Sequence, residues 1–153
     1  MSGWTNNNLL ISEVLQKVSN AKTKKEKISL LVQNNSPALR SILVWNYDES
    51  IITLLPEGEV PFTPNDSPKG TEHSLLAKEY AKLYYYIKGG ADQVPQVRRE
   101  SMFIGLIEGL HRSEAEVVCL AKDGKLQDKF RITLATVKDA FPQIEWGNRG
   151  PAE

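Results

Sequence analysis

Apolar residues recur at helical spacing in the first third of the chain. Residues 10–20 carry them on one face, at Leu10, Ile11, Val14, Leu15 and Val18, which predicts a helix entered from an Asn6–Asn8 cap. Thr23 with Glu26 forms a capping box for a second helix, and Ser36-Pro37 has the cap and first-turn residues of a third. The positions expected to face inward on these two helices are Ile28, Leu31, Val32, Leu39, Ile42, Leu43 and Trp45.

The second half predicts four more helices. They cover about 72–88, 95–110, 113–124 and 133–141, with Gly89 ending the first, a Ser113–Glu116 capping box opening the third, and Thr133 capping the last. The positions expected inside are Leu76, Tyr80, Leu83, Tyr84, Ile87, Val97, Phe103, Ile104, Leu106, Ile107 and Leu110. Tyr84, Tyr85 and Tyr86 would fan around the helix, so we expect core positions and one surface tyrosine rather than a stacking platform for bases.

Prolines interrupt this pattern between the two halves. Four of them stand at 56, 61, 64 and 68, which forbids a helix and predicts a long loop with Val60 and Phe62 as anchors. Before the loop, the apolar run 51–55 fits a helical turn or a strand, and we favour the helix. The prediction is an all-α fold, one compact domain of six or seven helices over 1–153, with a Pro-rich loop at 55–70 and a frayed tail at 147–153.

Charge and composition narrow the classes of function. The 153 residues include 41% hydrophobic and 25% charged positions with zero formal net charge, typical of a globular domain and unlike a protein that coats nucleic acid. Residues 1–47 nevertheless hold six Lys/Arg against two carboxylates, and residues 48–80 hold two against seven. The lone Cys119 allows no internal disulfide, and neither a secretory signal nor a membrane-spanning run is visible. We therefore expect a cytoplasmic protein that does not enter membranes.

No constellation of residues predicts an active site. His73 and His111 are far apart in sequence and lack zinc spacing, and Cys119 lies in an apolar run where a free cysteine usually packs as a small hydrophobe. The pair Glu108 and His111 occurs once, whereas a di-iron bundle needs it twice; a capping or surface histidine fits better. We predict no metal and no cofactor, and keep an uncharacterised enzyme, with Glu108 and His111 as its nominees, as the third hypothesis.

Two surfaces are candidates for binding. The first hypothesis is a protein partner held by Glu57, Glu59, Phe62 and Asp66 of the loop, and the second is nonspecific nucleic-acid binding through phosphates at Lys22, Lys24, Lys25 and Lys27. A helix-turn-helix reader is disfavoured because the connection between the last two predicted helices is too long. Gly105 and Gly109 allow a close helix contact, within the monomer or in a homodimer.

Four stretches resemble a family of uncharacterised proteins from T4-like tailed phages, notably phages of marine bacteria. They are Trp4–Leu15, Pro37–Pro61, Arg99–His111 and Phe141–Arg149, which together span nearly the whole chain. The resemblance implies a phage protein acting in the host cytoplasm, and it brings no catalytic residues. Small phage proteins of this kind commonly act by binding, either as accessories to phage replication and transcription or as blockers of host proteins. The partner we expect is therefore a phage or host protein, with the replication or transcription machinery as one candidate source.

Overall fold

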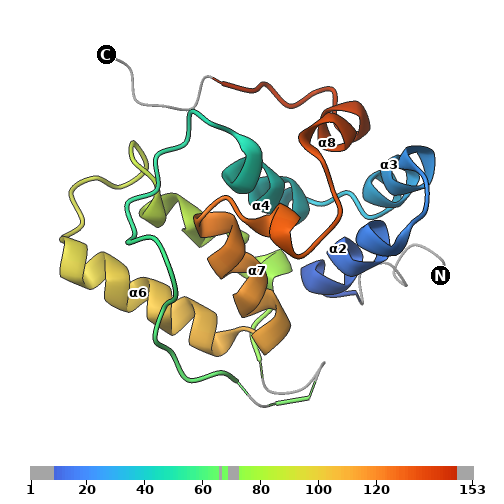
Figure 1. Cartoon of the computed structure of the whole chain (residues 1–153). Helices are drawn as coiled ribbons and strands as arrows, with labels where there is room; N and C mark the ends of the chain where they lie inside the picture. The colour runs from blue at the N-terminus through green and yellow to red at the C-terminus, as the bar shows by residue number, and fades with distance from the viewer. Residues whose placement is uncertain (1–8, 66, 69–72, 148–153) are drawn as a thin grey trace.

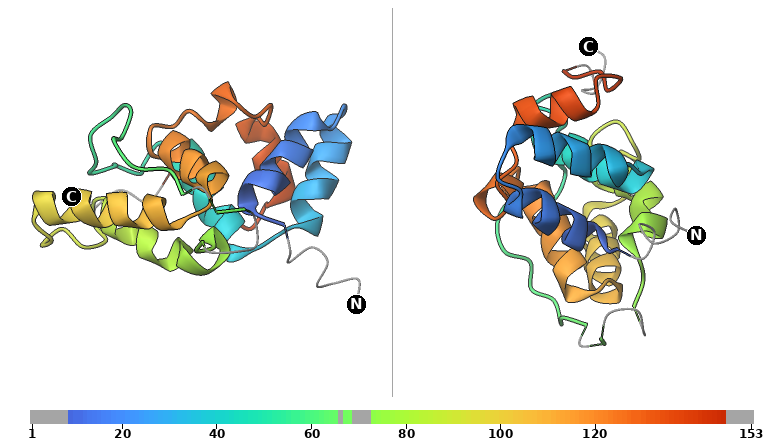
Figure 2. Two further views of the ribbon diagram at one scale, coloured as in Figure 1. Left: turned by 90° about the horizontal axis from the view of Figure 1, so that it is seen from below. Right: turned by 90° about the vertical axis from the view of Figure 1, so that its right-hand side faces the viewer.

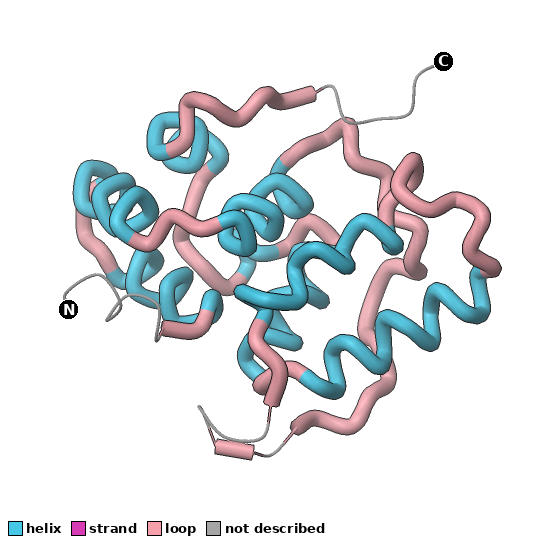
Figure 3. The backbone as a smooth tube through the Cα atoms, turned by 180° about the vertical axis from the view of Figure 1, so that it is seen from behind, coloured by secondary structure: helices cyan, strands magenta, loops and turns pink. Residues whose placement is uncertain are grey.

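A computed structural model describes residues 9–65, 67, 68 and 73–147 of the protein. In these residues the chain forms helices and loops, without a β-strand (Figure 3). The α-helices are α2 (Ile11–Asn20), α3 (Lys24–Gln33), α4 (Pro37–Tyr47), α5 (Leu76–Glu79), α6 (Gln96–Gly109), α7 (Arg112–Lys122) and α8 (Leu134–Ala140). Two 3-10 segments complete them, η1 (Tyr80–Tyr86) and η2 (Leu126–Asp128). The all-α prediction is confirmed.

The cap residues start their helices as predicted. The side-chain oxygens of Thr23, Ser36 and Thr133 accept the N–H groups of Glu26, Leu39 and Thr136, at 3.1, 3.1 and 3.3 Å. Each bond satisfies one of the four backbone donors that a helix leaves unpaired at its start. These three helix starts therefore follow from local sequence alone.

Two other helix starts differ from the prediction. At α7 the cap is His111, whose Nδ1 accepts the N–H of Ser113 at 3.1 Å, so the proposed capping box at Ser113 is wrong. At α2 the carboxylate of Glu13 accepts the N–H of Leu10 at 2.8 Å. The predicted cap at Asn6–Asn8 lies outside the described residues.

Residues 51–55 are extended, and the helix predicted there is wrong. Thr53 pairs with Ile87 as an isolated antiparallel bridge, with Leu54 N–H donating to Tyr86 O and Lys88 N–H to Ile52 O, both at 2.8 Å. The β-branched residues Ile51, Ile52 and Thr53 fit this extended backbone, and Pro56 ends any continuation as a helix. The predicted helix 72–88 is replaced by the short α5 followed by the 3-10 segment η1.

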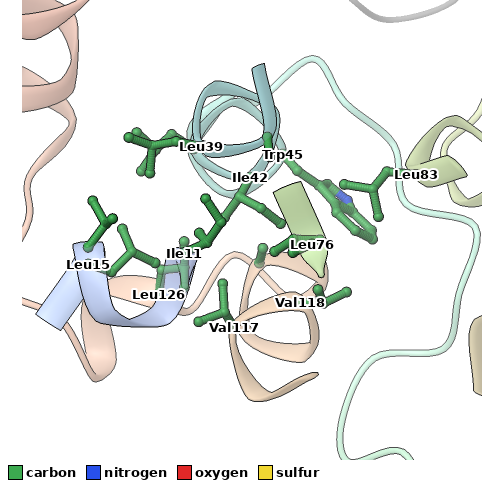
Figure 4. Close-up of a cluster of buried hydrophobic side chains, with 14 of the residues drawn as sticks. Ile11, Leu15, Leu39, Ile42, Trp45, Leu76, Leu83, Val117, Val118 and Leu126 are labelled. Atoms are coloured by element: carbon green, nitrogen blue, oxygen red, sulfur yellow. The ribbon is translucent and has the colours of Figure 1, made fainter. Parts of the chain in front are cut away.

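The core is one cluster to which nearly every described element contributes. α4 packs against α7, α5 and η1, so the first and second halves of the chain share one interior. Figure 4 shows Ile42 and Trp45 of α4 facing side chains of α2, α5 and α7. The largest fully buried side chains are Tyr86, Phe103, Phe141, Leu15, Leu31, Leu39, Ile42, Leu43, Leu76, Ile107, Leu110 and Leu126.

Three apolar residues expected inside face the solvent instead. Val97 is 80% exposed, Val32 51% and Tyr84 45%. Helical spacing marks an apolar stripe, but it does not say how far a partner element covers that stripe. For Tyr84 the cause is the 3-10 winding of η1, which redistributes consecutive residues around the axis.

The helices occupy two opposite ends of the molecule and the region between them. α2, α3 and α8 gather at one end, and α6 lies at the other, with α4 and α7 between them (Figure 1 and the left panel of Figure 2). The loop that follows α4 runs past α7 and α6 on the outside. Every helix in the described ranges is too short or too polar to cross a lipid bilayer.

Candidate functional site

The described part of the Pro-rich loop, residues 55–65, is named here the acidic loop. Leu55 is buried, and Val60 and Phe62 are half-buried against the core, as anchors should be. Glu57 and Glu59 are exposed on either side of Gly58, whose φ of +104° is a conformation that favours glycine. Asp66, the fourth residue of the predicted partner site, lies outside the described residues. The acidic loop therefore presents two carboxylates and turns its apolar side chains inward.

Hydrogen bonds hold the acidic loop against α6 and α7. The buried Lys122 ammonium donates to Pro56 O at 2.7 Å, to Gly58 O at 3.2 Å and to the Asp123 carboxylate at 2.6 Å. Asp123 in turn accepts the N–H of Gly58 at 3.1 Å. Lys122 is 4% exposed, so its charge is compensated by the carboxylate and two carbonyls rather than by water. The backbone around Glu57 and Glu59 is thereby fixed.

Two further bonds tie this part of the chain to α6, one at Leu54 just before the acidic loop and one at Thr63 within it. The Glu108 carboxylate accepts Thr63 N–H at 2.8 Å, and Gln96 Nε2 donates to Leu54 O at 2.7 Å. Glu108, a nominee for catalysis, is thus engaged by the loop, while His111 bonds to Ser113. Val97, the most exposed of the large apolar side chains described, follows Gln96 at the start of α6.

The opposite end of the molecule carries a basic groove between α2, α3 and the segment from η2 to α8. It consists of two adjoining cavities of about 420 and 720 Å³, which share Lys27 and Arg131. Their lining residues are Gln16, Ser19, Asn20, Ala21, Lys22, Lys24, Lys27, Gln127, Phe130, Arg131, Ile132, Thr133 and Thr136. Three of the four predicted lysines meet here; Lys25 is exposed outside the lining.

Among the further cations of the sequence, Arg131 is the one that the fold brings to the lysines of this groove. It lies about a hundred residues from the lysines, and its backbone is tied to their end of the molecule. Its N–H donates to Ser19 Oγ at 2.9 Å, and its carbonyl accepts a bond from Lys27 Nζ. No local pattern joins residues so far apart, so only the folded chain could reveal this cluster.

The two histidines meet at the start of α7. Their rings are 5.3 Å apart in an edge-to-face arrangement, although 38 positions separate them, and His111 Nδ1 lies 2.7 Å from Ser113 Oγ. Beside them the Glu114 carboxylate, 1% exposed, accepts Ile11 N–H at 2.8 Å and Leu76 N–H at 3.0 Å. Burial raises the pKa of Glu114. The two carboxylate bonds satisfy backbone donors at the starts of α2 and α5, which is a structural role.

The other features that the sequence suggested are the Cys119 thiol, a metal site and the helix contact at Gly105 and Gly109. Burial raises the pKa of the Cys119 thiol to about 11, which keeps it protonated and unreactive near neutral pH. No group of three or more metal-ligating side chains gathers within the described ranges. A Cβ at Gly109 would lie 3.3 Å from Ser74 Oγ, whereas one at Gly105 would meet open space. The helix contact at Gly109 is therefore internal, and the homodimer through the Gly105 and Gly109 face stays a prediction.

Comparison with known proteins gives a family without a known function. Residues 14–128 match the model of the family of unknown function DUF6433. No curated protein matches the chain, and no solved structure does. The geometry of its own surfaces is therefore the basis for a functional assignment.

Proposed function

We propose that this chain, which belongs to the family of unknown function DUF6433, acts without catalysis, by binding a protein partner through the acidic loop. One observation carries this proposal. The loop is long and rich in proline, yet Lys122, Asp123 and Glu108 hold it in one conformation with Glu57 and Glu59 outside. A surface loop that is fixed in advance loses little conformational entropy when a partner binds.

The surroundings of the acidic loop suit a protein partner. Ile52, 46% exposed, lies three residues before the acidic loop, and Val97, 80% exposed, follows Gln96, whose side chain bonds to Leu54 O. Protein interfaces combine apolar contacts with polar groups of complementary charge. The partner we propose therefore presents a basic patch beside an apolar one.

The biological setting is part of the same proposal. The resemblance to proteins of T4-like tailed phages supports a phage accessory or host-takeover protein, whose partner belongs to the phage or to the host replication or transcription machinery. We propose no enzymatic step, because Glu108 and Glu114 are both committed to backbone N–H groups.

Charge reversal in the acidic loop tests the proposal. The tagged protein is purified from infected host cells with and without nuclease, and its partners are identified by mass spectrometry. We expect Glu57→Lys with Glu59→Lys to lose a stoichiometric protein partner that survives nuclease, since both side chains are exposed and their reversal repels a basic patch.

The matched control reverses Glu49 and Asp128, which are exposed carboxylates outside the acidic loop. This control variant should keep the partner. If the loop variant retains every partner of the wild type, or if nuclease removes them all, protein binding by the loop is wrong. Phe62→Ala serves as a separate probe, because loss of this half-buried side chain should loosen the loop rather than remove a charge.

A further inference from the structure

We propose that the basic groove binds the sugar-phosphate backbone of a nucleic-acid duplex, as a second site independent of the acidic loop. The groove lies between α2, α3 and the segment that leads into α8. Figure 1 shows these helices at the end of the molecule away from α6. Lys22, Lys24, Lys27 and Arg131 line its two cavities, and among the described lining residues there is no carboxylate.

The four cations are only weakly neutralised by the protein. The Lys27 ammonium donates to the carbonyls of Ser19 and Arg131, which satisfies its hydrogen bonds but leaves its charge uncompensated by a carboxylate. Lys24 pairs with Asp139 at 2.7 Å, with both side chains more than half exposed, so water and salt screen that pair. Lys22 and Arg131 are exposed. A polyanion entering the groove would therefore meet a net positive field.

The position of the lysines on α3 opposes helix stability. Lys24, Lys25 and Lys27 lie in its first turn or next to it, where the partial positive charge of the helix dipole and the neighbouring cations disfavour them. Glu26 is the one acidic residue of that turn. Departures from a local stability rule are expected at functional sites. Phosphate binding gives this placement a physical reason.

The lining chemistry favours a phosphate backbone over other anionic partners. Val32, Ile52, Tyr84 and Val97 are the exposed large hydrophobics among the described residues, and none of them lines the groove, so an acidic protein would find no apolar anchor there. The groove's one aromatic residue, Phe130, is 2% exposed and offers no face for unpaired bases to stack on. Cations with polar Gln and Thr side chains suit phosphate and sugar contacts on a duplex.

Fluorescence anisotropy with a labelled DNA duplex of about 20 base pairs and mixed sequence tests the site, with affinity measured across a salt series. Contact with three or four phosphates predicts a slope of log K against log salt of about −3. We expect Lys22→Gln with Arg131→Gln to weaken binding at low salt by about tenfold or more and to reduce the slope by about 2. Both side chains are exposed and carry no described bond to the rest of the protein.

The control is Lys78→Gln with Lys88→Gln, which removes the same charge at exposed positions outside the groove. It should leave affinity nearly unchanged. The groove assignment is overturned if both double variants lose affinity equally, if the wild type does not bind at low salt, or if single-stranded DNA or polyglutamate competes better than duplex. The melting temperature of the Lys22→Gln, Arg131→Gln variant, expected to equal the wild-type value because both side chains are exposed, separates lost binding from lost folding.

Discussion

At the scale of single residues, glycines show how far the local environment decides the effect of a side chain. Gly105 lies inside α6, and a Cβ there would have no atom within 4 Å. At Gly90, just after η1, a Cβ would lie 2.1 Å from the carbonyl oxygen of Tyr84. The same change to alanine therefore removes backbone freedom at one site and forces a backbone collision at the other.

Alanine at the two positions should change stability in opposite directions. We expect Gly105→Ala to raise the free energy of unfolding by about 0.5–1 kcal/mol, because alanine is the better residue inside a helix. Gly90→Ala should lower it by about 1–3 kcal/mol through overpacking. Urea unfolding followed by circular dichroism measures both. Equal signs for the two variants would contradict the geometry, and a loss of dimer with Gly105→Ala would instead favour the homodimer face.

At the scale of elements, helices that carry their own start signals were predictable and segments fixed by distant contacts were not. Thr23, Ser36 and Thr133 cap their helices as the sequence indicates, since each bond spans three residues. Residues 51–55 became extended because they pair with residues 86–88, at and just after the end of η1, about 34 positions further along. A pairing partner so distant leaves no periodic mark on the segment itself.

In the candidate site, too, features set by local sequence were predictable and features fixed by distant contacts were not. The sequence could nominate Glu57, Glu59 and the lysines near α3, because prolines and charge clusters are local features. It could not show that Lys122, at the end of α7, reaches back across about 65 positions to the acidic loop. Val97 was placed inside by its spacing, yet it is exposed, since nothing in the sequence tells which apolar positions remain uncovered.

Lys122 should hold the acidic loop in place. We expect Lys122→Met to lower the free energy of unfolding by about 3 kcal/mol, because it removes three hydrogen bonds and leaves Asp123 without its buried counter-charge. Amide hydrogen exchange should then rise at residues 55–60 more than in α4. Lys25→Met, a change at an exposed lysine, should alter stability by less than about 0.5 kcal/mol. A loop that stays equally protected in Lys122→Met would show that Phe62 and Glu108 suffice to hold it.

At the scale of the whole molecule, Glu114 connects distant parts of the chain. Its two carboxylate oxygens accept the N–H groups at the start of α2 and of α5, 103 and 38 positions away, while Glu114 itself lies in the first turn of α7. A buried group that joins three helices at their unpaired ends affects the stability of all of them together. Burial raises its pKa above the ordinary value of 4.5, mainly by desolvating the charged form.

This raised pKa fixes the sign of a pH effect on stability. Between pH 4.5 and the raised pKa, the folded protein binds more protons at Glu114 than the unfolded chain does. The contribution of Glu114 to the free energy of unfolding therefore falls as pH rises through that window. Glu114→Gln removes the titration and sets an amide NH2 group, which only donates, against one of the two N–H donors, whereas the hydroxyl of the protonated carboxyl can still accept. We therefore expect it to be less stable by about 1–3 kcal/mol at low pH.

The stability gap between the wild type and Glu114→Gln should be widest near pH 4.5 and narrow as pH rises. Urea unfolding of both proteins at a series of pH values measures the gap, and the contributions of titratable groups that both proteins share largely cancel in the difference. A gap that does not change with pH would mean that Glu114 ionises in the folded protein as it does in water. A gap that widens with pH would mean that the two N–H bonds lower its pKa more than burial raises it.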